Sequence, residues 1–555
     1  MKTLLRAVWK WVALHRRNIS STGFFVALIF LAFSLTPSLL PRLPLIQGVL
    51  SGIVFAVGYW TGCLFIFLWR YLELPETKNQ YTTYLQILSS IVVGASITYA
   101  FSHWTMWQNS ILQEMGQSIL QANQSIPTVI GVAFVIANIF ILTGYVIKRL
   151  MHFIIKQIYK FIPRRISNFI GIIIALGLIF GLVNGVLIEV AFNMIDSGAA
   201  KVNQLTDDGV AMPMNILKTG SNESLIAWNT LGREGRNFIA NGPSAEKISS
   251  FTGAPAIEPL RVYVGLESAD SINTRAELAL NELKRINAFD RSVLIITTPT
   301  GTGWMDPGAV DSIEYIHGGD TVNVGIQYSY LSSQSTLLFL PTIANKTSEV
   351  MFHTIYNHWK TLPQKTRPKL YLFGLSLGSF GSEHSTKLHE IIEDPIDGAL
   401  WAGPPFVNSL HRDITNNRNV NSPAWLPTYG DGSLVRFTSK DNNLDNYESE
   451  WGVLRLIYIQ HATDAISFFS PNLFYKKPDW LIGERGPDVS PFLHWQPVVT
   501  FFQILFDLTA SVKNTPIGHG HHFSSDSYID SWVSLTDPPN WGNDLTTRLK
   551  ELFTK

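Results

Sequence analysis

Hydrophobic positions are distributed unevenly along the chain, and their pattern changes near residue 195. Before that point, five apolar segments follow one another: residues 23–40, 48–69, 84–101, 126–147 and 166–190. A helix needs roughly 20 apolar residues to cross the hydrocarbon core of a bilayer. The pattern therefore predicts an N-terminal all-α transmembrane bundle of about five spans, over residues 1–195.

Beyond residue 259 the apolar runs are short and alternate with amphipathic stretches of helical length. Strands are expected at residues 260–265, 292–299, 321–330, 369–375, 398–403 and 452–460, with helices at 274–285 and 348–362. Strands separated by helix-length connections predict an α/β domain with a mainly parallel sheet, here residues 259–555. The polar segment between the two domains, residues 196–258, is expected to be a linker or a cover over the substrate side.

Basic residues predict how the spans are oriented. Lys and Arg are concentrated at residues 2–17 and 148–165, whereas the loop 102–125 has neither. Basic segments remain on the cytoplasmic side, so the N-terminus is expected there. Five spans then place the C-terminal domain on the extracytoplasmic side of a cytoplasmic (inner) membrane. The first span lacks a small-x-small cleavage site, so we expect a retained anchor and not a signal peptide.

Glycines recur at four-residue intervals inside the spans. The groups are Gly48 with Gly52, Gly58 with Gly62, and Gly177 with Gly181 and Gly185. Such faces allow helices to approach closely. We expect packing within the bundle, and a homo-oligomer through these glycine-rich spans is the alternative.

Composition excludes several classes of function. The 555 residues carry a formal net charge of zero, and only 15% of them are charged. This balance offers no electrostatic footprint for nucleic acid. Cys63 is the only cysteine, so neither a disulfide framework nor a Cys-based metal site can form within one chain.

The candidate chemistry centres on Ser376, in the motif Gly374-Leu-Ser-Leu-Gly378. Gly-x-Ser-x-Gly after an apolar strand is the pattern of a nucleophile elbow, a tight turn that lifts the serine hydroxyl above the sheet. An ordinary strand-to-helix turn is the alternative, because five residues recur by chance. In an elbow, the N–H of Leu377 is one expected oxyanion donor.

Asp464 is the candidate acid. It follows the expected strand 452–460, and ligands of parallel sheets bind at the carboxyl ends of the strands. Asp397 precedes its strand and would lie at the opposite edge, and Asp445 has no clear strand context. Asp464 is therefore expected to orient the catalytic base and to stabilise its charged form.

The candidate base lies in Gly518-His-Gly-His-His522. Serine is a weak nucleophile at its own pKa, so a histidine must take its proton. We prefer His519, because its glycine neighbours suit an exposed loop tip, and keep His521 as the alternative. The cluster has no carboxylate at a ligand spacing, so we expect neither a metal nor another cofactor.

A second glycine-bearing loop, residues 299–304, also follows an expected strand. Gly301, Thr302 and Gly303 are expected to line the pocket or to donate a backbone N–H to the oxyanion. The loop lacks the Gly-Lys-Ser/Thr ending of a phosphate loop.

Eight short motifs are spread over nearly the whole chain, at residues 36–42, 300–304, 327–330, 374–378, 401–405, 460–464, 485–489 and 516–521. Together they resemble the membrane-anchored bacterial α/β-hydrolase family, which joins an N-terminal multi-span domain to a C-terminal hydrolase domain. The order Ser, Asp, His also matches that of α/β-hydrolases. The resemblance implies a hydrolase fold and a serine nucleophile, and no particular substrate. Members commonly carry Glu where this chain has Leu375, which bears on the polarity of the pocket.

These observations favour a serine esterase, lipase or acyltransferase that uses Ser376, Asp464 and one of the two histidines. Its expected partners are the lipid bilayer and a lipid or acylated envelope substrate, because a soluble nutrient would not require a tether. The alternative is a non-enzymatic envelope assembly or binding protein that retains a hydrolase-like domain. A fluorophosphonate probe distinguishes the two hypotheses.

Overall fold

The chain divides into two compact units. The computed structural model describes residues 20–75, 79–119, 126–182, 188–387, 391–510 and 515–554. Unit 1 is Met1–Gly185 with Phe469–Ile482 and Gly486–Thr515, and unit 2 is Val186–Phe468 with Gly483–Arg485 and Pro516–Lys555. The sequence pattern treated residues 259–555 as one domain. In the structure, most of the stretch 469–515 belongs to the unit of the N-terminal helices.

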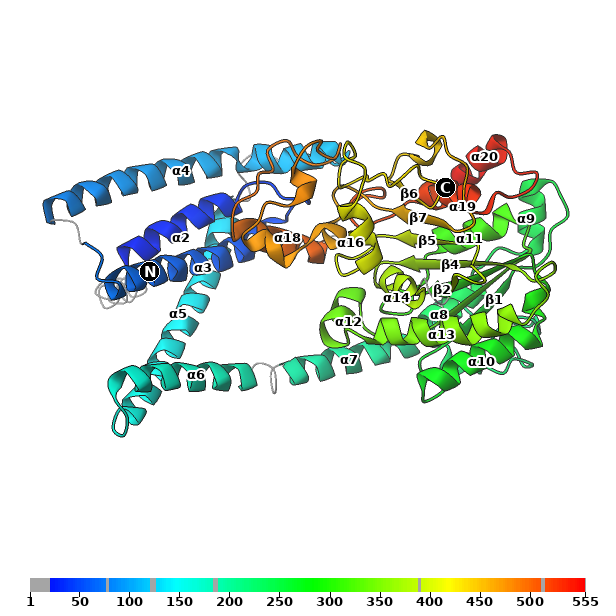
Figure 1. Cartoon of the computed structure of the whole chain (residues 1–555), viewed down its shortest axis with the longest axis horizontal. Helices are drawn as coiled ribbons and strands as arrows, with labels where there is room; N and C mark the ends of the chain where they lie inside the picture. Colours follow the sequence, from blue (N-terminus) through cyan, green and yellow to red (C-terminus); the bar gives the residue numbers. More distant parts are fainter. Residues whose placement is uncertain are drawn as a thin grey trace. The chain divides into compact units, whose positions relative to one another are not determined.

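Unit 1 is helical (Figure 1). Its helices are α2 (Ser21–Ser34), α3 (Pro44–Tyr71), α4 (Asn79–Glu114), α5 (Ile126–Ile158), α6 (Arg164–Leu182) and α18 (Val499–Ala510). The stretch 469–515, called the late segment below, also forms two short 3-10 helices, η5 (Pro471–Phe474) and η6 (Asp479–Leu481).

Three helices of the described residues are long and apolar enough to cross a membrane: Pro44–Tyr71, Thr83–Glu114 and Ile126–Ile158. The expectation of about five spans is therefore supported for three. Helix α2 has 14 residues, fewer than the roughly 20 that a span requires. The predicted fifth span is divided between α6 and α7 (Ile188–Gln204), and residues 183–187 lie outside the described part.

Four glycines of α3 allow close contacts with neighbouring helices in unit 1. A side chain at any of four positions would collide with a neighbouring helix, in the pairs Gly48 with Val132, Gly52 with Ile136, Gly58 with Ala27 and Gly62 with Gly23. Residue numbers rise together along α3 and α5 and in opposite senses along α3 and α2. Helix α3 therefore runs parallel to α5 and antiparallel to α2, and these glycines pack within the chain as expected.

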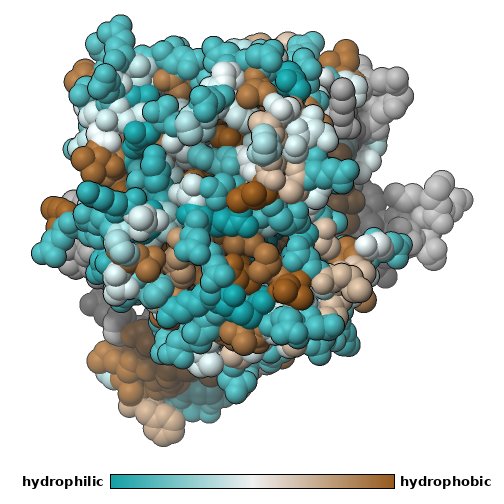
Figure 2. Space-filling view, turned by 90° about the vertical axis from the view of Figure 1, so that its right-hand side faces the viewer, coloured by the Kyte–Doolittle hydropathy of each residue, from teal (hydrophilic) through white to brown (hydrophobic). Residues whose placement is uncertain are grey.

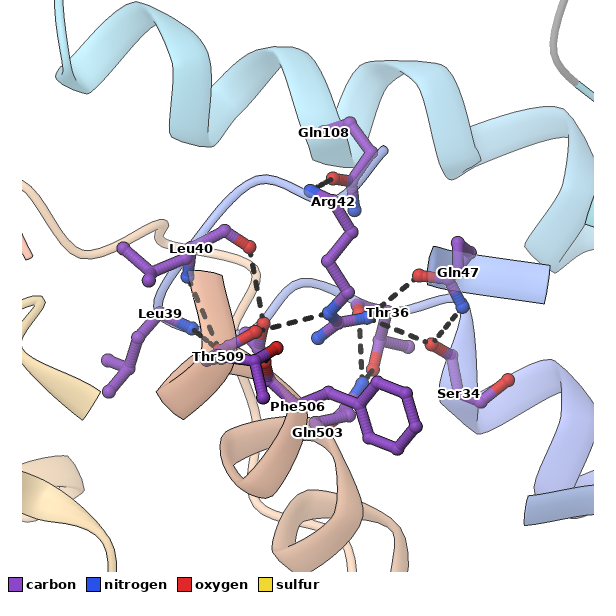
Figure 3. A network of polar contacts seen from close by, with 12 residues as sticks. Ser34, Thr36, Leu39, Leu40, Arg42, Gln47, Gln108, Gln503, Phe506 and Thr509 are labelled. Atoms are coloured by element: carbon purple, nitrogen blue, oxygen red, sulfur yellow. Dashed lines mark hydrogen bonds and ion pairs between the residues drawn. The ribbon is translucent and has the colours of Figure 1, made fainter. Parts of the chain in front are cut away.

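A buried polar network joins α18 to the connection between α2 and α3 (Figure 3). Nε of Arg42 lies 3.2 Å from Oδ1 of Asp507, and the two side chains are 1% and 0% exposed. The other carboxylate oxygen of Asp507 accepts the N–H groups of Leu39 and Leu40, at 3.1 and 3.4 Å. Nη1 of Arg42 donates to Gln47 at 2.8 Å. The motif at residues 36–42 therefore encloses a carboxylate from the late segment of the same unit.

Unit 2 contains a parallel sheet, as expected. Its seven strands are β1 (Leu260–Val264), β2 (Val293–Thr298), β3 (Thr321–Ile326), β4 (Lys369–Leu375), β5 (Gly398–Ala402), β6 (Val435–Thr438) and β7 (Arg455–Ile459). They lie in the order β1-β3-β2-β4-β5-β7-β6, and all the pairs are parallel. Six of these strands coincide with expected ones, and β6 was missed.

Helices cover both faces of the sheet. The side chains of β2 alternate between two cores, with Leu294 and Ile296 in one and Val293 and Ile295 in the other. The first core is completed by α8 (Gly232–Ala240), α10 (Ile272–Arg285) and α13 (Ile343–Lys360). The second is completed by α9 (Ala245–Thr252), α11 (Pro307–Ile316), α19 (Ser525–Thr536) and α20 (Asn543–Thr554).

The segment expected as a linker is part of this packing. Ile239 on α8 and Ile248 on α9 are almost fully buried, at 1% and 0% exposure. Arg236, also on α8, is buried and donates to the carbonyl oxygens of Asn203, Gln204 and Leu205. Residues 232–252 therefore belong to the folded core of unit 2. The apolar side chains of α8 pack on one face of the sheet, and those of α9 pack on the other face.

The surface of unit 2 is mainly hydrophilic on the face shown in Figure 2, with smaller apolar areas among polar ones. The candidate spans of unit 1 differ, since they expose large apolar side chains such as Phe67 and Ile91, at 62% and 63%. Isolated apolar residues are normal on the surface of a soluble protein, whereas a larger continuous apolar area marks a surface that contacts a membrane or another protein.

Candidate active site

Ser376 lies in a strained turn between a strand and a helix. Strand β4 ends at Leu375, and helix α14 (Leu377–Ser385) begins at the next residue after the serine. Ser376 has φ 57° and ψ −126°, and its side chain is largely buried. A positive φ is uncommon in a residue other than glycine, and such strain concentrates at functional sites. This is the backbone geometry of a nucleophile elbow.

The two glycines of the motif are required by close packing. A Cβ on Gly374 would lie 2.5 Å from the carbonyl oxygen of Gly378. A Cβ on Gly378 would lie 2.2 Å from the carbonyl oxygen of Thr298, at the end of β2. The turn therefore excludes side chains two residues before and two residues after the serine, and it brings the start of α14 against the loop that follows β2.

That loop contains the other candidate oxyanion donors. The N–H of Gly301 donates to Ser333 Oγ at 3.2 Å, and the N–H of Gly303 donates to Thr300 O at 2.9 Å. Of the three expected residues, only Thr302 retains an N–H without an acceptor in the described part of the chain. Leu377 is the first residue of α14, where helical N–H groups have no partner within the helix.

Asp464 and His521 form a buried pair. Nδ1 of His521 lies 2.7 Å from Oδ2 of Asp464, and the side chains are 3% and 0% exposed. The carboxylate also accepts the N–H of Ile466 at 2.9 Å and the hydroxyl of Ser467 at 3.1 Å. Asp464 is thus held from several directions beyond the carboxyl end of β7, where the sequence placed it.

The histidine loop is fixed against the loop of the acid. The N–H of Gly520 donates to Thr463 Oγ1 at 3.0 Å, and the carbonyl oxygen of Gly520 lies 2.9 Å from Nδ1 of His461. The loop closes on itself through the N–H of Gly518, which donates to His522 O at 2.8 Å. It is therefore a tight, buried turn and not an exposed tip.

The structure separates the two histidines. The side chain of His521 pairs with Asp464. The backbone of His519 forms an isolated antiparallel β-bridge with that of His522 within the turn, and the N–H of His519 donates to Pro516 O. The sequence-based preference for His519 assumed exposure, yet His519 is only 8% exposed. The geometry favours His521.

The three catalytic candidates meet at the carboxyl ends of neighbouring strands. The N–H of Ser376 donates to Ala402 O at the end of β5, and the His521 ring lies against the adjacent Gly403. Nε2 of His521 is buried and has no hydrogen-bond partner in the described part of the chain. No hydrogen bond joins this nitrogen to Ser376 Oγ within those residues. Catalytic hydrogen bonds are often long before substrate binds.

Sequence reasoning missed a buried carboxylate behind the elbow. Glu383, on α14, accepts hydrogen bonds from Asn408 Nδ2 and Tyr458 Oη at 2.9 Å and from the N–H of Leu410 at 2.8 Å. Burial raises the pKa of Glu383. Nothing in its local sequence distinguished this residue, because its partners come from two distant segments. It fixes α14, and therefore the elbow, against β7.

Two other residues near the loop after β2 have structural roles. Asp306 accepts the N–H of Gly308 at 3.0 Å and caps α11, and burial raises its pKa to about 6. The hydroxyl of Tyr328 donates to Pro299 O at 2.9 Å and so fixes the loop. The described residues contain no group of three or more His, Cys, Asp or Glu side chains that could hold a metal ion.

Comparisons with known proteins agree with the fold of unit 2. A family model described as "Alpha/beta-hydrolase family" matches residues 260–549, and one described as "Alpha/beta-hydrolase family N-terminus" matches residues 35–243. No curated protein and no solved structure matches the chain.

Proposed function

We propose that this chain, since it belongs to the alpha/beta-hydrolase family, is a membrane-anchored serine hydrolase with Ser376, His521 and Asp464 as its triad. The observation that carries the proposal is the buried pair of His521 and Asp464, beside a serine in a strained turn. A structural ion pair does not need a buried Nε2 without a hydrogen-bond partner beside such a turn. A catalytic base needs one, because Nε2 must accept the proton of the serine.

The proposed reaction is acyl transfer from an ester. Ser376 Oγ attacks the ester carbonyl while His521 Nε2 takes its proton, and Asp464 stabilises the imidazolium through Nδ1. The N–H groups of Leu377 and Thr302 are the proposed donors to the oxyanion. His521 then returns the proton to the leaving alkoxide, which departs as an alcohol and leaves an acyl group on Ser376. Water or a second alcohol removes that group by the same steps in reverse, so the enzyme is an esterase, a lipase or an acyltransferase.

The proposed substrate is an ester of a lipid or envelope component. Three helices that could cross a membrane support a tethered enzyme. In the arrangement that we propose, the N-terminus is cytoplasmic and unit 2 lies on the extracytoplasmic side of the cytoplasmic membrane. A tether restricts diffusion to the membrane plane and favours substrates in the same plane.

Covalent labelling tests the proposal. Full-length protein in native membranes is treated with a fluorophosphonate, and the adduct is mapped by mass spectrometry to Ser376. Ser376→Ala should abolish the adduct, whereas Ser385→Ala, at the opposite end of α14, should retain it. If the wild-type protein takes no label while a control hydrolase does, the enzyme proposal fails and the non-enzymatic binding protein becomes the better hypothesis.

A further inference from the structure

The motif Gln327-Tyr-Ser-Tyr330 begins directly after strand β3 and takes no part in the proposed triad. Its first residue, Gln327, is fully buried, with 0% exposure. A buried amide needs partners for its oxygen and for both hydrogens of its nitrogen, because an unpaired polar group in the interior costs free energy. The partners of this amide therefore indicate what the motif does.

The side-chain amide of Gln327 joins three segments of unit 2. Its Oε1 accepts the N–H of Leu266, which follows β1, at 3.1 Å. Its Nε2 donates to Asn203 Oδ1 and to Thr302 O, each at 2.9 Å. Asn203 belongs to α7, the helix with which the chain enters unit 2. Because a backbone N–H can donate only to the amide oxygen, Leu266 fixes the orientation of this amide and directs both hydrogens to the other two partners.

The loop 299–304, called the glycine loop below, is held on both sides of one peptide group. Before this group, the N–H of Gly301 donates to Ser333 Oγ at 3.2 Å. After it, the carbonyl oxygen of Thr302 accepts the hydrogen bond from Gln327. The peptide group between these two anchors carries the N–H of Thr302, the one that has no acceptor among the described residues. The glycine loop therefore fixes the surroundings of the N–H group that it leaves unpaired.

A second buried side chain holds the next carbonyl group of the glycine loop. The hydroxyl of Tyr263, on β1, donates to Gly303 O at 2.7 Å, and Tyr263 is 0% exposed. A Cβ on Gly303 would lie only 2.3 Å from this hydroxyl oxygen, and the residue has φ 91°, so glycine is required here. Two consecutive carbonyl oxygens are thus fixed by buried side chains. This arrangement restricts rotation of the preceding peptide group, which carries the N–H of Thr302.

We propose that Gln327 is a positioning residue for the oxyanion donor: it holds Thr302 O and thereby orients the N–H of Thr302. An oxyanion donor is effective when its direction is set before charge develops on the substrate. Because Gln327 is fully buried, it acts through the glycine loop and not by contact with the substrate. The inference rests on the proposed function, since it requires the N–H of Thr302 to bind the oxyanion.

Two substitutions of similar size remove the support. Gln327→Met deletes both donors, whereas Gln327→Glu keeps the acceptor for Leu266 and places a second oxygen against Thr302 O. A displaced oxyanion donor raises the energy of the transition state and leaves binding of the ground state unchanged. We therefore expect each variant to lower kcat on a p-nitrophenyl ester about 10- to 100-fold, with KM within about twofold of the wild-type value.

A trifluoromethyl ketone measures the oxyanion interaction directly. Ser376 Oγ adds to the ketone carbon, the serine proton passes to His521, and the ketone oxygen becomes the oxyanion. The affinity of full-length, detergent-solubilised protein for this ketone should weaken in both Gln327 variants by about the same factor as kcat. Loss of stability alone would lower Tm without this selective change in the folded protein.

The matched control is Asn323→Leu. Asn323 is another buried amide, at 1% exposure on β3, and its Oδ1 accepts the hydroxyl of Thr297 at 2.6 Å. The substitution removes a buried hydrogen bond of the same sheet without touching the glycine loop. It should therefore leave kcat and the affinity for the ketone within about twofold of the wild-type values.

The results separate this inference from the proposed function. A wild-type kcat in a folded Gln327 variant overturns the inference, as does a higher KM at unchanged kcat or an equal loss in Asn323→Leu. Gln327→Glu preserves the shape of the side chain, so it decides the question if Gln327→Met does not fold. If the wild-type protein neither hydrolyses the ester nor binds the ketone, the proposed function itself fails and this inference falls with it.

Discussion

Asp464 and His521 lie 2.7 Å apart in unit 2, although most of the chain between them belongs to unit 1. Apart from Gly483–Arg485, the chain belongs to unit 1 from Phe469 to Thr515, where it contributes α18, and it re-enters unit 2 at Pro516, just before the histidine loop. The proposed acid therefore lies shortly before the stretch that belongs mostly to unit 1, and the proposed base lies shortly after it.

The two histidines should differ in their effect on catalysis. His521→Ala should lower kcat by about 10⁴-fold or more on an activated ester, because the base that accepts the Ser376 proton is lost. His519→Ala should cost much less, because its side chain does not pair with Asp464. Steady-state hydrolysis of a p-nitrophenyl ester by the purified full-length protein measures both. Similar losses in the two variants would contradict the assignment of His521.

The elbow should not tolerate a methyl group at Gly378. In Gly378→Ala the new Cβ would collide with Thr298 O, which lies 2.2 Å from its ideal position. Overpacking of this kind costs about 1–3 kcal/mol, and the shift would displace the serine. We expect lower stability and loss of fluorophosphonate labelling at Ser376. Gly542→Ala is the control, because no atom lies within 4 Å of a Cβ there; labelling that survives in Gly378→Ala would disprove the packing argument.

The buried ion pair of unit 1 should be costly to break. Asp507→Asn leaves the Arg42 guanidinium buried without its counter-ion, and removal of one partner of such a pair typically costs about 3–5 kcal/mol. Thermal denaturation of the detergent-solubilised protein measures the loss. Arg548→Gln, which breaks an exposed contact with Asp544, should cost less than about 1 kcal/mol. Equal shifts of Tm in the two variants would argue against a structural role for the Arg42 network.

Periodicity was sufficient for most of unit 2, since its strands are apolar runs between amphipathic helices. Strand β6 escaped because it has only four residues and carries Arg436, whose guanidinium stacks on Trp451 at 3.9 Å. A short apolar run that contains a charged residue is interpreted as a loop unless the stacking partner of that residue is known.

Long-range partners also explain what was missed in unit 1. Helix α18 is apolar, yet Asp507 interrupts it, and its counter-ion Arg42 is more than 400 residues away in sequence. The sequence could not identify the base for the same reason, because His519 and His521 lie in one short loop and nothing in the local sequence distinguishes them. Only the fold of the turn against Thr463 shows which of them reaches Asp464.

The stability of unit 2 should fall in mild acid through His411. This side chain, on α16 (Ser409–Asn416), is 6% exposed, and Nε2 lies 2.7 Å from Gln460 Oε1. Burial lowers its pKa from 6.5 to about 4. Between these values the unfolded chain binds a proton that the folded state excludes, so the free energy of unfolding decreases as pH falls from 6.5 towards 4.

His411→Gln should remove this contribution, because glutamine keeps a hydrogen-bonding amide near Gln460 and does not titrate. The wild-type protein should lose up to about 1.4 kcal/mol per pH unit more than the variant over that range, and the difference should level off below pH 4. Subtracting the variant cancels the opposite trend of Asp306, whose pKa is raised to about 6, and the parallel trend of His317, whose pKa is lowered to about 4. Hydrogen exchange of the peptides that contain β5 and β7, followed at several pH values, measures the difference. If the two proteins show the same pH dependence, His411 is not buried in its neutral form as the structure implies.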